Sequence, residues 1–359
     1  MAPRRSSVAS APGSSGCTSG GSPVRADRSR KTSNPRSLET SLVVSTTTRQ
    51  HGQGWFGEPA IEHDRDSSER LGHDRAAGAR FLSTHRHRRR FNVVGPCHDE
   101  LHYMLNASTR LVEVPDLVAR GAYVVVHAPR LHGRTTWLRG LAAGLAEGGA
   151  WAVVRASCRP RGGAAEGASG ERALLEAIAR AAGEQLPAPL RPPPWPPSYD
   201  VRFAGVVLSA WARACPRPLV LLLDDVDLLP RETRASLLTQ MRATYEARPR
   251  AAPWSVVFCG SEEVQASAVE LLGPGSTSLR LPDFTAAQVA TLCAEHTEET
   301  GQPFRDEAVA QIAAISGGHP WVVNVLAREI VEKLRPPLRQ PITAVHVRTA
   351  AERLRGAWV

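Results

Sequence analysis

Residues 128–136, APRLHGRTT, contain a glycine, a cation and two hydroxyls in an order suited to phosphate binding. The general phosphate-loop pattern is G-x-x-x-x-G-K-[ST], in which backbone N–H groups and a helix N-terminus surround the anion. Ala128 stands here at the first glycine position and Arg134 at the lysine position, whereas Gly133 matches the pattern. The candidate nucleotide-binding residues are Ala128, Pro129, Arg130, Leu131, His132, Gly133, Arg134, Thr135 and Thr136. The competing interpretation is an ordinary strand-to-helix turn.

A second candidate site follows the apolar run of residues 219–223, where the sequence continues with Asp224 and Asp225. A hydrophobic strand that ends in two acids is the Walker B arrangement. We expect Asp224, with Thr135, to hold Mg²⁺, and Asp225 to take the catalytic, water-activating position. The alternative is a buried strand followed by a solvated acidic turn. The two candidate sites lie about 90 residues apart with a strand and helices between them, as a phosphate-loop sheet requires.

Strands and helices alternate around these two sites. The strands are apolar on both faces, which predicts a parallel sheet covered by helices on both sides. The predicted strands cover residues 123–127, 151–157, 219–225 and 254–260, and the predicted helices 133–145, 171–185, 201–214 and 235–245. The proline-rich stretch 187–197 is predicted to be a stiff loop.

After residue 284 only helical patterns occur. They cover residues 286–300, 306–316, 321–334 and 343–355 and predict a small all-helical lid. The expected organisation is a disordered basic extension (1–90), an α/β P-loop NTPase domain (91–283) and a helical lid domain (284–359). For residues 1–90 we prefer a disordered or artefactual extension, such as a mis-assigned start, to a targeting peptide.

The basic charge of the chain is concentrated in its first part. Residues 1–90 hold 16 Lys/Arg and 8 Asp/Glu, whereas the remaining 269 residues hold 28 and 27. A nucleic-acid partner is therefore not indicated for the folded part. Lysine is nearly absent, with 42 Arg against Lys31 and Lys333, which suggests a coding bias.

The six cysteines are scattered and form no CxxC pair, so buried thiols in a reducing cytoplasm are expected. No apolar run is long enough to cross a membrane, and no membrane role is predicted without a partner.

Several segments resemble a bacterial group of AAA-like P-loop ATPases, and the resemblance covers about 260 residues. It implies an α/β nucleotide domain with a helical lid, places residues 95–105 near the nucleotide base, and makes Ala128 normal at the first loop position. The matching segments are FNVVGPCHDELHYML (91–105), VVVHAPRLHGRTTWL (124–138), RPLVLLLDDVDLL (217–229), MRATYEARP (241–249), DFTAAQVATLCAEHTEETGQPF (283–304) and SGGHPWVVNVLAREI (316–330).

Three positions depart from the pattern of that group. It has Lys where this chain has Arg134, Glu where this chain has Asp225, and Arg-Asp shortly after a glycine where this chain reads Ser261-Glu-Glu. Arg binds phosphate well but does not fit the slot of a compact ammonium. Asp225 is one methylene shorter than Glu, about 1.5 Å, and a misplacement of about 1 Å can cost on the order of 100-fold in rate. Ser261 and Arg328 are possible γ-phosphate sensors; the alternative for Arg328 is a solvated helix face.

The sequence thus predicts a cytoplasmic ATP-binding protein with Mg²⁺ and weak or absent hydrolysis. The first alternative is a degenerate pseudo-ATPase that serves as a scaffold for an unknown protein partner. The second is a nucleic-acid-binding protein that uses the basic extension, against which the near-neutral charge of residues 91–359 argues. A milder interpretation of Arg134 is that coding bias introduced it and the site tolerates it.

Overall fold

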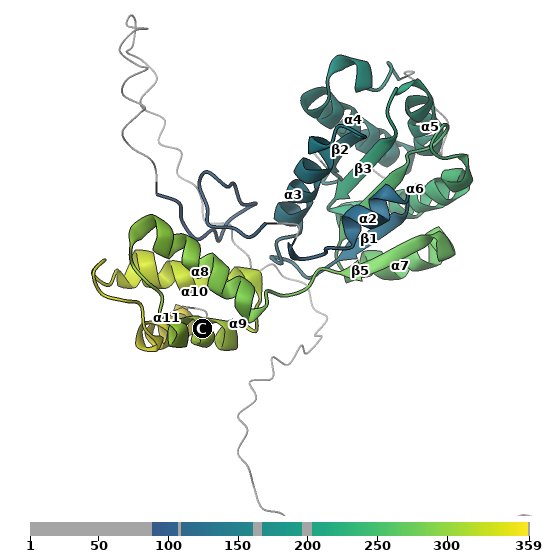
Figure 1. Cartoon of the computed structure of the whole chain (residues 1–359). Helices are drawn as coiled ribbons and strands as arrows, with labels where there is room; N and C mark the ends of the chain where they lie inside the picture. The colour runs from purple at the N-terminus through teal and green to yellow at the C-terminus, as the bar shows by residue number, and fades with distance from the viewer. Residues whose placement is uncertain (1–87, 107–108, 161–166, 196–202, 358–359) are drawn as a thin grey trace, which may run out of the picture. The chain divides into compact units, whose positions relative to one another are not determined.

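The computed structural model describes residues 88–106, 109–160, 167–195 and 203–357 (Figure 1). All of them belong to one compact unit of the chain, Asp74–Val359. The predicted extension, up to residue 87, and the end of the proline-rich loop lie outside the described residues. The described residues begin at 88, three residues before the predicted start of the nucleotide domain at 91. In this short segment Arg89 forms an ion pair of 3.0 Å with Glu295 and a second of 3.1 Å with Glu299.

A five-stranded parallel sheet forms the centre of the first part, with the strand order β2-β3-β4-β1-β5. The strands are β1 (Tyr123–His127), β2 (Ala152–Ser157), β3 (Leu219–Asp224), β4 (Ser255–Gly260) and β5 (Ser276–Arg280). Because all strands are parallel, their carboxyl ends meet at one edge of the sheet. The loop after β1 and the acids after β3 therefore lie at the same edge, with only β4 between their strands.

Alternation within the strands explains why their sequences are apolar throughout. Side chains of successive residues point to opposite faces of a sheet. In β1, Tyr123 and Val125 belong to one hydrophobic cluster, whereas Val124 and Val126 belong to another. In β3, Leu219, Leu221 and Leu223 join the first cluster, and Val220 and Leu222 the second. Both faces of the sheet are thus buried, and a polar side chain at an odd or an even position of these strands would enter one of the two hydrophobic clusters.

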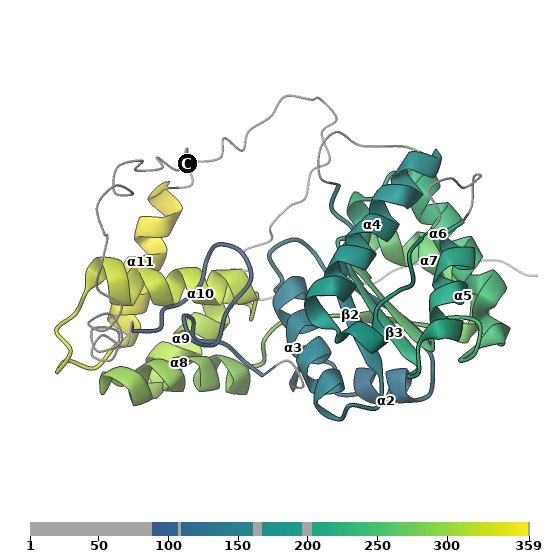
Figure 2. The same cartoon turned by 90° about the horizontal axis from the view of Figure 1, so that it is seen from above.

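Helices cover both faces of this sheet (Figures 1 and 2). The cluster on one face includes residues of α2 and α3, and the cluster on the other includes residues of α4, α5, α6 and α7. The bounds are α2 (Val114–Ala119), α3 (Arg134–Glu147), α4 (Gly167–Gln185), α5 (Ala204–Ala214), α6 (Arg231–Thr244) and α7 (Glu262–Leu272), with short helices η2 (Ala188–Leu190), η3 (Val226–Leu228), η4 (Tyr245–Ala247) and η5 (Gly273–Gly275).

A helical region follows the sheet and has its own core. It comprises α8 (Ala286–Thr300), α9 (Asp306–Ser316), α10 (Pro320–Arg328), the π-helix η6 (Glu329–Leu334) and α11 (Ala344–Ala357). A capping box begins α8, in which the Gln288 N–H donates to the Thr285 hydroxyl and the Thr285 N–H donates to the Gln288 side chain. Phe91 and Tyr103, from the segment before the sheet, also pack in this core.

The predicted fold class, a parallel P-loop sheet flanked by helices and followed by helices, is confirmed. The sequence did not predict β5, α2 or α7. β5 has the sequence STSLR and lies at the sheet edge with every residue partly or fully exposed, so it lacks the apolar run that identified the other strands. Among the described residues, no helix is long and apolar enough to cross a membrane.

Candidate functional site

The predicted phosphate loop connects β1 to α3 at the carboxyl edge of the sheet. Gly133 adopts a left-handed conformation (φ 78°) immediately before α3, and the Trp137 N–H donates to its carbonyl as the helix begins. Leu131 is also left-handed (φ 63°), an uncommon conformation for a residue with a Cβ. The chain thus turns sharply and directs the free N–H groups of the first turn of α3 toward the loop.

A cavity of about 600 Å³ lies beside this loop, within the size range of small-molecule sites. Residues from the loop, from the ends of β2 and β3, from the segment 92–105 and from the helical region contribute to its wall. The sequence-predicted site residues that line this cavity are Arg130, Leu131, His132, Gly133, Arg134, Thr135, Thr136, Asp224 and Asp225. Ala128 and Pro129 belong to the same loop but do not line the cavity.

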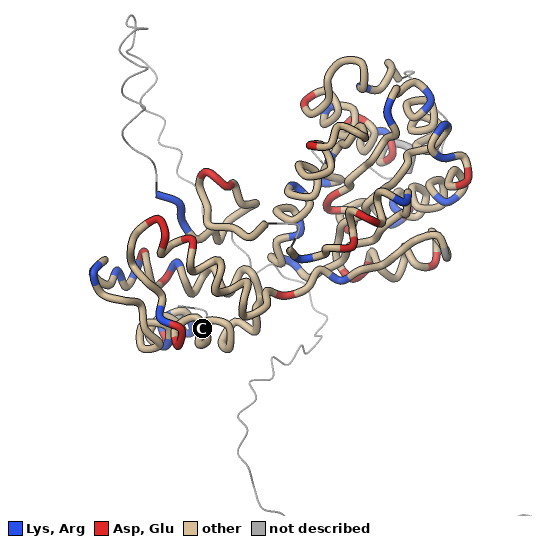
Figure 3. Tube along the Cα trace, viewed as in Figure 1, with Lys and Arg blue, Asp and Glu red and all other residues tan. Residues whose placement is uncertain are grey.

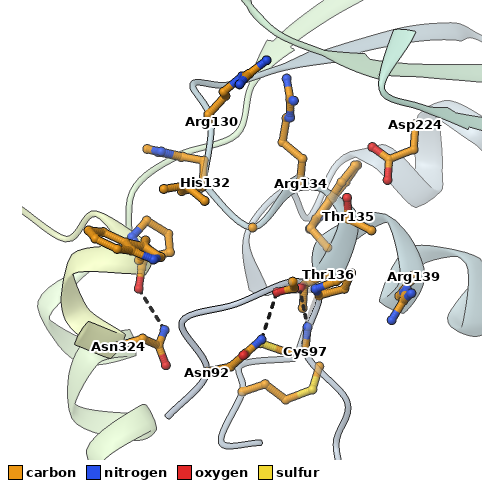
Figure 4. A pocket seen from close by; sticks show the side chains of 18 of the residues that line it. Asn92, Cys97, Arg130, His132, Arg134, Thr135, Thr136, Arg139, Asp224 and Asn324 are labelled. Carbon is orange, nitrogen blue, oxygen red and sulfur yellow. Dashed lines mark hydrogen bonds between the residues drawn. The ribbon is translucent and has the colours of Figure 1, made fainter. Parts of the chain in front are cut away.

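Thr135 and Asp224 form the pair expected of a magnesium site (Figure 4). Asp224 ends β3, is only 1% exposed and accepts a hydrogen bond from the Asp225 N–H at 3.0 Å. Burial raises its pKa, and the Thr135 side chain, which hydrogen-bonds to it, opposes that rise. A hydroxyl and a carboxylate are both hard oxygen ligands suited to Mg²⁺.

Arg134 does not extend along the loop toward open solvent. Its Nη1 donates to the Ala128 carbonyl at 3.2 Å and lies 3.6 Å from Asp227 Oδ1. Both side chains of this ion pair are nearly buried, at 11% and 9% exposed. In Figure 4 the side chains of Arg134 and Thr136 extend in opposite directions from the start of α3. The cation at the lysine position is therefore held by groups of the protein itself.

Asp225 is also engaged. It has φ 57°, a left-handed conformation, and its Oδ2 accepts from the Ser157 hydroxyl at 3.1 Å. Arg159 Nε lies 3.7 Å from the same oxygen, although Arg159 is largely exposed. The Asp225 Oδ2 atom therefore already has a hydroxyl and a guanidinium beside it.

The segment 92–105, part of which the resemblance places near the nucleotide base, lies against the start of α3. The Cys97 N–H donates to Thr136 Oγ1 at 3.0 Å, and Asn92 donates to the Gly95 carbonyl at 2.9 Å. From the helical region, the Trp321 Nε1–H of α10 donates to the Val93 carbonyl of this segment at 3.0 Å. Asn324 of α10 also lines the cavity, and its Oδ1 finds no hydrogen-bond partner among the described residues.

Arg110 is a site residue that the sequence did not single out. It is buried, donates from Nη1 to the His132 carbonyl at 3.0 Å, and donates from Nη2 to the Pro282 carbonyl. Its guanidinium also lies over the Phe284 ring, 5.0 Å from the centroid. Burial lowers its pKa to about 10, against the opposing effect of Asp283. Arg110 thus joins the phosphate loop to the segment that enters the helical region.

His132 adds a second connection between the loop and that segment. Its Nε2 lies 2.9 Å from Asp283 Oδ1, without the alignment of a hydrogen bond, and its ring meets the His319 ring edge-on at 4.7 Å. Burial lowers the pKa of His132 to about 4, so the ring is neutral at pH 7. No local sequence signal marks these contacts, since their partners are more than 140 residues away.

The two candidate sensors lie apart from the cavity wall. Ser261 precedes α7 without capping it through its side chain, and it is not among the residues that line the cavity. Arg328 ends α10 and forms an ion pair of 2.9 Å with Glu332, one turn further along. The structure therefore brings the loop and the acids of β3 together, but neither candidate sensor with them.

Charge is unevenly distributed around the cavity. Six arginines and three aspartates line it, namely Arg110, Arg130, Arg134, Arg139, Arg155, Arg159, Asp224, Asp225 and Asp227. Across the described part of the chain, by contrast, basic and acidic residues are interspersed (Figure 3). The excess of guanidinium groups in this one cavity favours an anionic ligand.

No protein-family model and no curated protein matches the sequence. Several solved structures are similar in fold. A Walker-type ATPase of Pyrococcus abyssi is 12% identical, with 74% of this chain and 76% of that chain covered and a TM-score of 0.49. The Orc1 protein of Aeropyrum pernix, solved in complex with DNA, is 17% identical (71% and 67% covered, TM-score 0.46). The RuvB Holliday junction branch migration motor of Thermotoga maritima is 16% identical (74% of each chain covered, TM-score 0.41).

Proposed function

We propose that this protein binds ATP together with Mg²⁺ in the cavity beside the phosphate loop and hydrolyses it weakly or not at all. The observation that carries the proposal is the pairing of Thr135 with the buried Asp224 at the carboxyl edge of the sheet. This pair stands next to a glycine turn and a helix N-terminus, which together favour a bound anion.

The residues present suit a magnesium–triphosphate. The free N–H groups at the start of α3 face the loop, and the arginines of the cavity supply compensating charge. Thr135 and Asp224 would hold Mg²⁺ with few protein oxygens, and Mg²⁺ commonly completes its shell with water and phosphate oxygens. The described residues contain no separate group of three His, Cys, Asp or Glu side chains that could hold a metal. When bound, the ion would neutralise charge on the phosphates.

Two contacts support slow turnover. Arg134 is paired with Asp227, so it is not free to follow charge that develops on a transferred phosphoryl group. Asp225 is shorter than the glutamate of the AAA-like group that the sequence resembles, and it contacts Ser157 and Arg159. Ser261 and Arg328, which do not line the cavity, stay predictions as sensors.

The alternative is a pseudo-ATPase that acts as a scaffold for a protein partner. The same two contacts favour it, since they satisfy the catalytic charges internally. Nucleotide binding separates the two proposals, because a scaffold of this kind would have no affinity for ATP. The cytoplasmic location and the identity of the partner stay predictions.

The test is isothermal titration of the full chain with ATP, with and without Mg²⁺. We expect binding that Mg²⁺ strengthens, and Asp224→Asn should remove most of the strengthening. Asp116→Asn is the matched control, because Asp116 is an exposed aspartate of α2 outside the cavity wall. No ATP binding by the native chain at millimolar concentration would rule the proposal out and leave the scaffold.

A further inference from the structure

Asp227 is an acidic residue of the cavity, and the proposed function does not say how it affects the affinity for the ligand. It lies in η3 (Val226–Leu228), directly after the acids of β3, and its side chain is 9% exposed. Its Oδ1 is buried and has no hydrogen-bond partner in the described part of the chain. A Cβ on Gly260, at the end of β4, would lie 3.0 Å from that oxygen, so the neighbouring strand leaves Asp227 little room to move.

Arg134 supplies the positive charge next to this carboxylate. Nη1 of Arg134 is 3.6 Å from Asp227 Oδ1, and the same nitrogen donates to the Ala128 carbonyl. The only other contact of a cation with Asp227 among the described residues goes to its backbone carbonyl, from Arg234. The Asp227 side chain therefore depends on Arg134 for its compensating charge.

We propose that Asp227 is a positioning residue that holds Arg134 back from the phosphates and thereby limits the affinity of the site for a polyphosphate. The inference rests on the proposed function, since it concerns the same cavity. Arg134 would then have two alternative sets of contacts. In one it contacts Asp227 and the Ala128 carbonyl, and in the other it contacts the phosphate of the ligand.

The reason is electrostatic. A nearly buried carboxylate without its cation is costly, and no hydrogen-bond donor among the described residues stands ready at its Oδ1 to replace the lost partner. A phosphate that draws Arg134 away from Asp227 must offset that cost. The measured binding free energy is therefore smaller than the interaction between Arg134 and the phosphate alone would give. Asn at position 227 has nearly the same shape without the charge, and it leaves Arg134 free for the ligand.

The experiment compares the native chain with Asp227→Asn and Asp225→Asn by titration with ATP and with inorganic tripolyphosphate. Both variants remove one negative charge from the cavity, but only Asp227 pairs with Arg134. We expect Asp227→Asn to bind both ligands about tenfold more tightly than the native chain. The fold-change in affinity for Asp225→Asn should be less than half of that. Equal gains for ATP and tripolyphosphate would locate the effect at the phosphates. Asp227→Ser, which also removes the charge, replaces Asp227→Asn if that variant does not fold.

The outcomes separate this inference from the proposed function. If the native chain binds ATP and the Asp227 variant binds no more tightly, or if Asp225→Asn gains as much, the inference is wrong and the proposed function stands. If only the Asp227 variant binds ATP, the inference stands and the native chain is not an ATP-binding protein. If neither binds ATP or tripolyphosphate, both are wrong.

Discussion

Arg134 and Asp225 show how single substitutions can separate binding from catalysis at a phosphate loop. Arg134 retains the positive charge that a phosphate requires, but its guanidinium contacts Asp227 and the Ala128 carbonyl through Nη1. Asp225 retains a carboxylate at the end of β3 but holds it on a shorter side chain, next to Ser157. Both changes preserve the sign of the charge and alter its position.

The double variant Arg134→Lys with Asp225→Glu should therefore raise turnover. Lysine restores a compact ammonium, and glutamate moves the base by about 1.5 Å, so we expect an increase of about 10- to 100-fold over the native chain. Release of inorganic phosphate from ATP at saturating Mg²⁺ measures it. Asp225→Asn in the Arg134→Lys background is the matched control and should show no increase. A native chain that is already as fast as the double variant would contradict this explanation of the two residues.

The sequence predicted some site residues and could not predict others. Thr135 and Asp224 follow from local patterns, because a loop after one parallel strand and acids after another must meet at one edge of the sheet. Arg110 and Asp227 carry no such pattern. The role of Arg110 depends on carbonyl groups of His132 and Pro282, and that of Asp227 on the rotamer of Arg134, which only the folded chain determines.

At the scale of elements, Gly318 fixes how the helical region meets the segment that leaves the sheet. It has φ 79°, and its carbonyl accepts the Phe284 N–H at 2.8 Å. A Cβ at this position would overlap the Phe284 carbonyl oxygen. Phe284 in turn lies under Arg110, so this close backbone approach supports one wall of the cavity.

Gly318→Ala should consequently be far more destabilising than an alanine at another left-handed glycine. Gly301, at the end of α8, has φ 73° and open space around its Cβ position, so Gly301→Ala is the matched control. We expect Gly301→Ala to lower the free energy of unfolding by about 1–2 kcal/mol, because of the backbone conformation alone. Gly318→Ala should lower it by about 1–3 kcal/mol more, because the new Cβ also overlaps the Phe284 carbonyl oxygen. Urea unfolding measures both, and equal losses would show that the approach to Phe284 is not constrained.

Strand prediction succeeded where the strand is largely buried and failed at the exposed edge strand β5. β1 and β3 are buried on both faces, so their apolar sequences identify them. β5 pairs only with β1 and is partly exposed, and its Ser and Thr residues resemble those of a loop. α10 was predicted to continue to residue 334, but it ends at Arg328 and becomes a π-helix, a change of hydrogen-bond register that apolar spacing does not reveal.

At the scale of the whole molecule, buried histidines should make stability depend on pH. His132 shows the effect most clearly, because burial lowers its pKa to about 4 from an ordinary value near 6.5. His319 and Arg110 lower it further, whereas Asp283 opposes them. Burial also lowers the pKa of His102, His127, His296 and His319.

The sign of the pH dependence follows from proton binding. Between pH 6.5 and 4 the unfolded chain binds a proton at His132 that the folded chain does not, so the free energy of unfolding falls as the pH falls through this window. One such group contributes at most about 1.4 kcal/mol per pH unit. His132→Gln should therefore make urea-unfolding free energies, measured from pH 7 to pH 4, fall less steeply than in the native chain. His346→Gln is measured beside it, because it removes one histidine on α11, away from the cavity wall. A slope that is the same in the native chain and in His132→Gln would mean that His132 takes up its proton equally in the folded and the unfolded chain, so that burial does not lower its pKa.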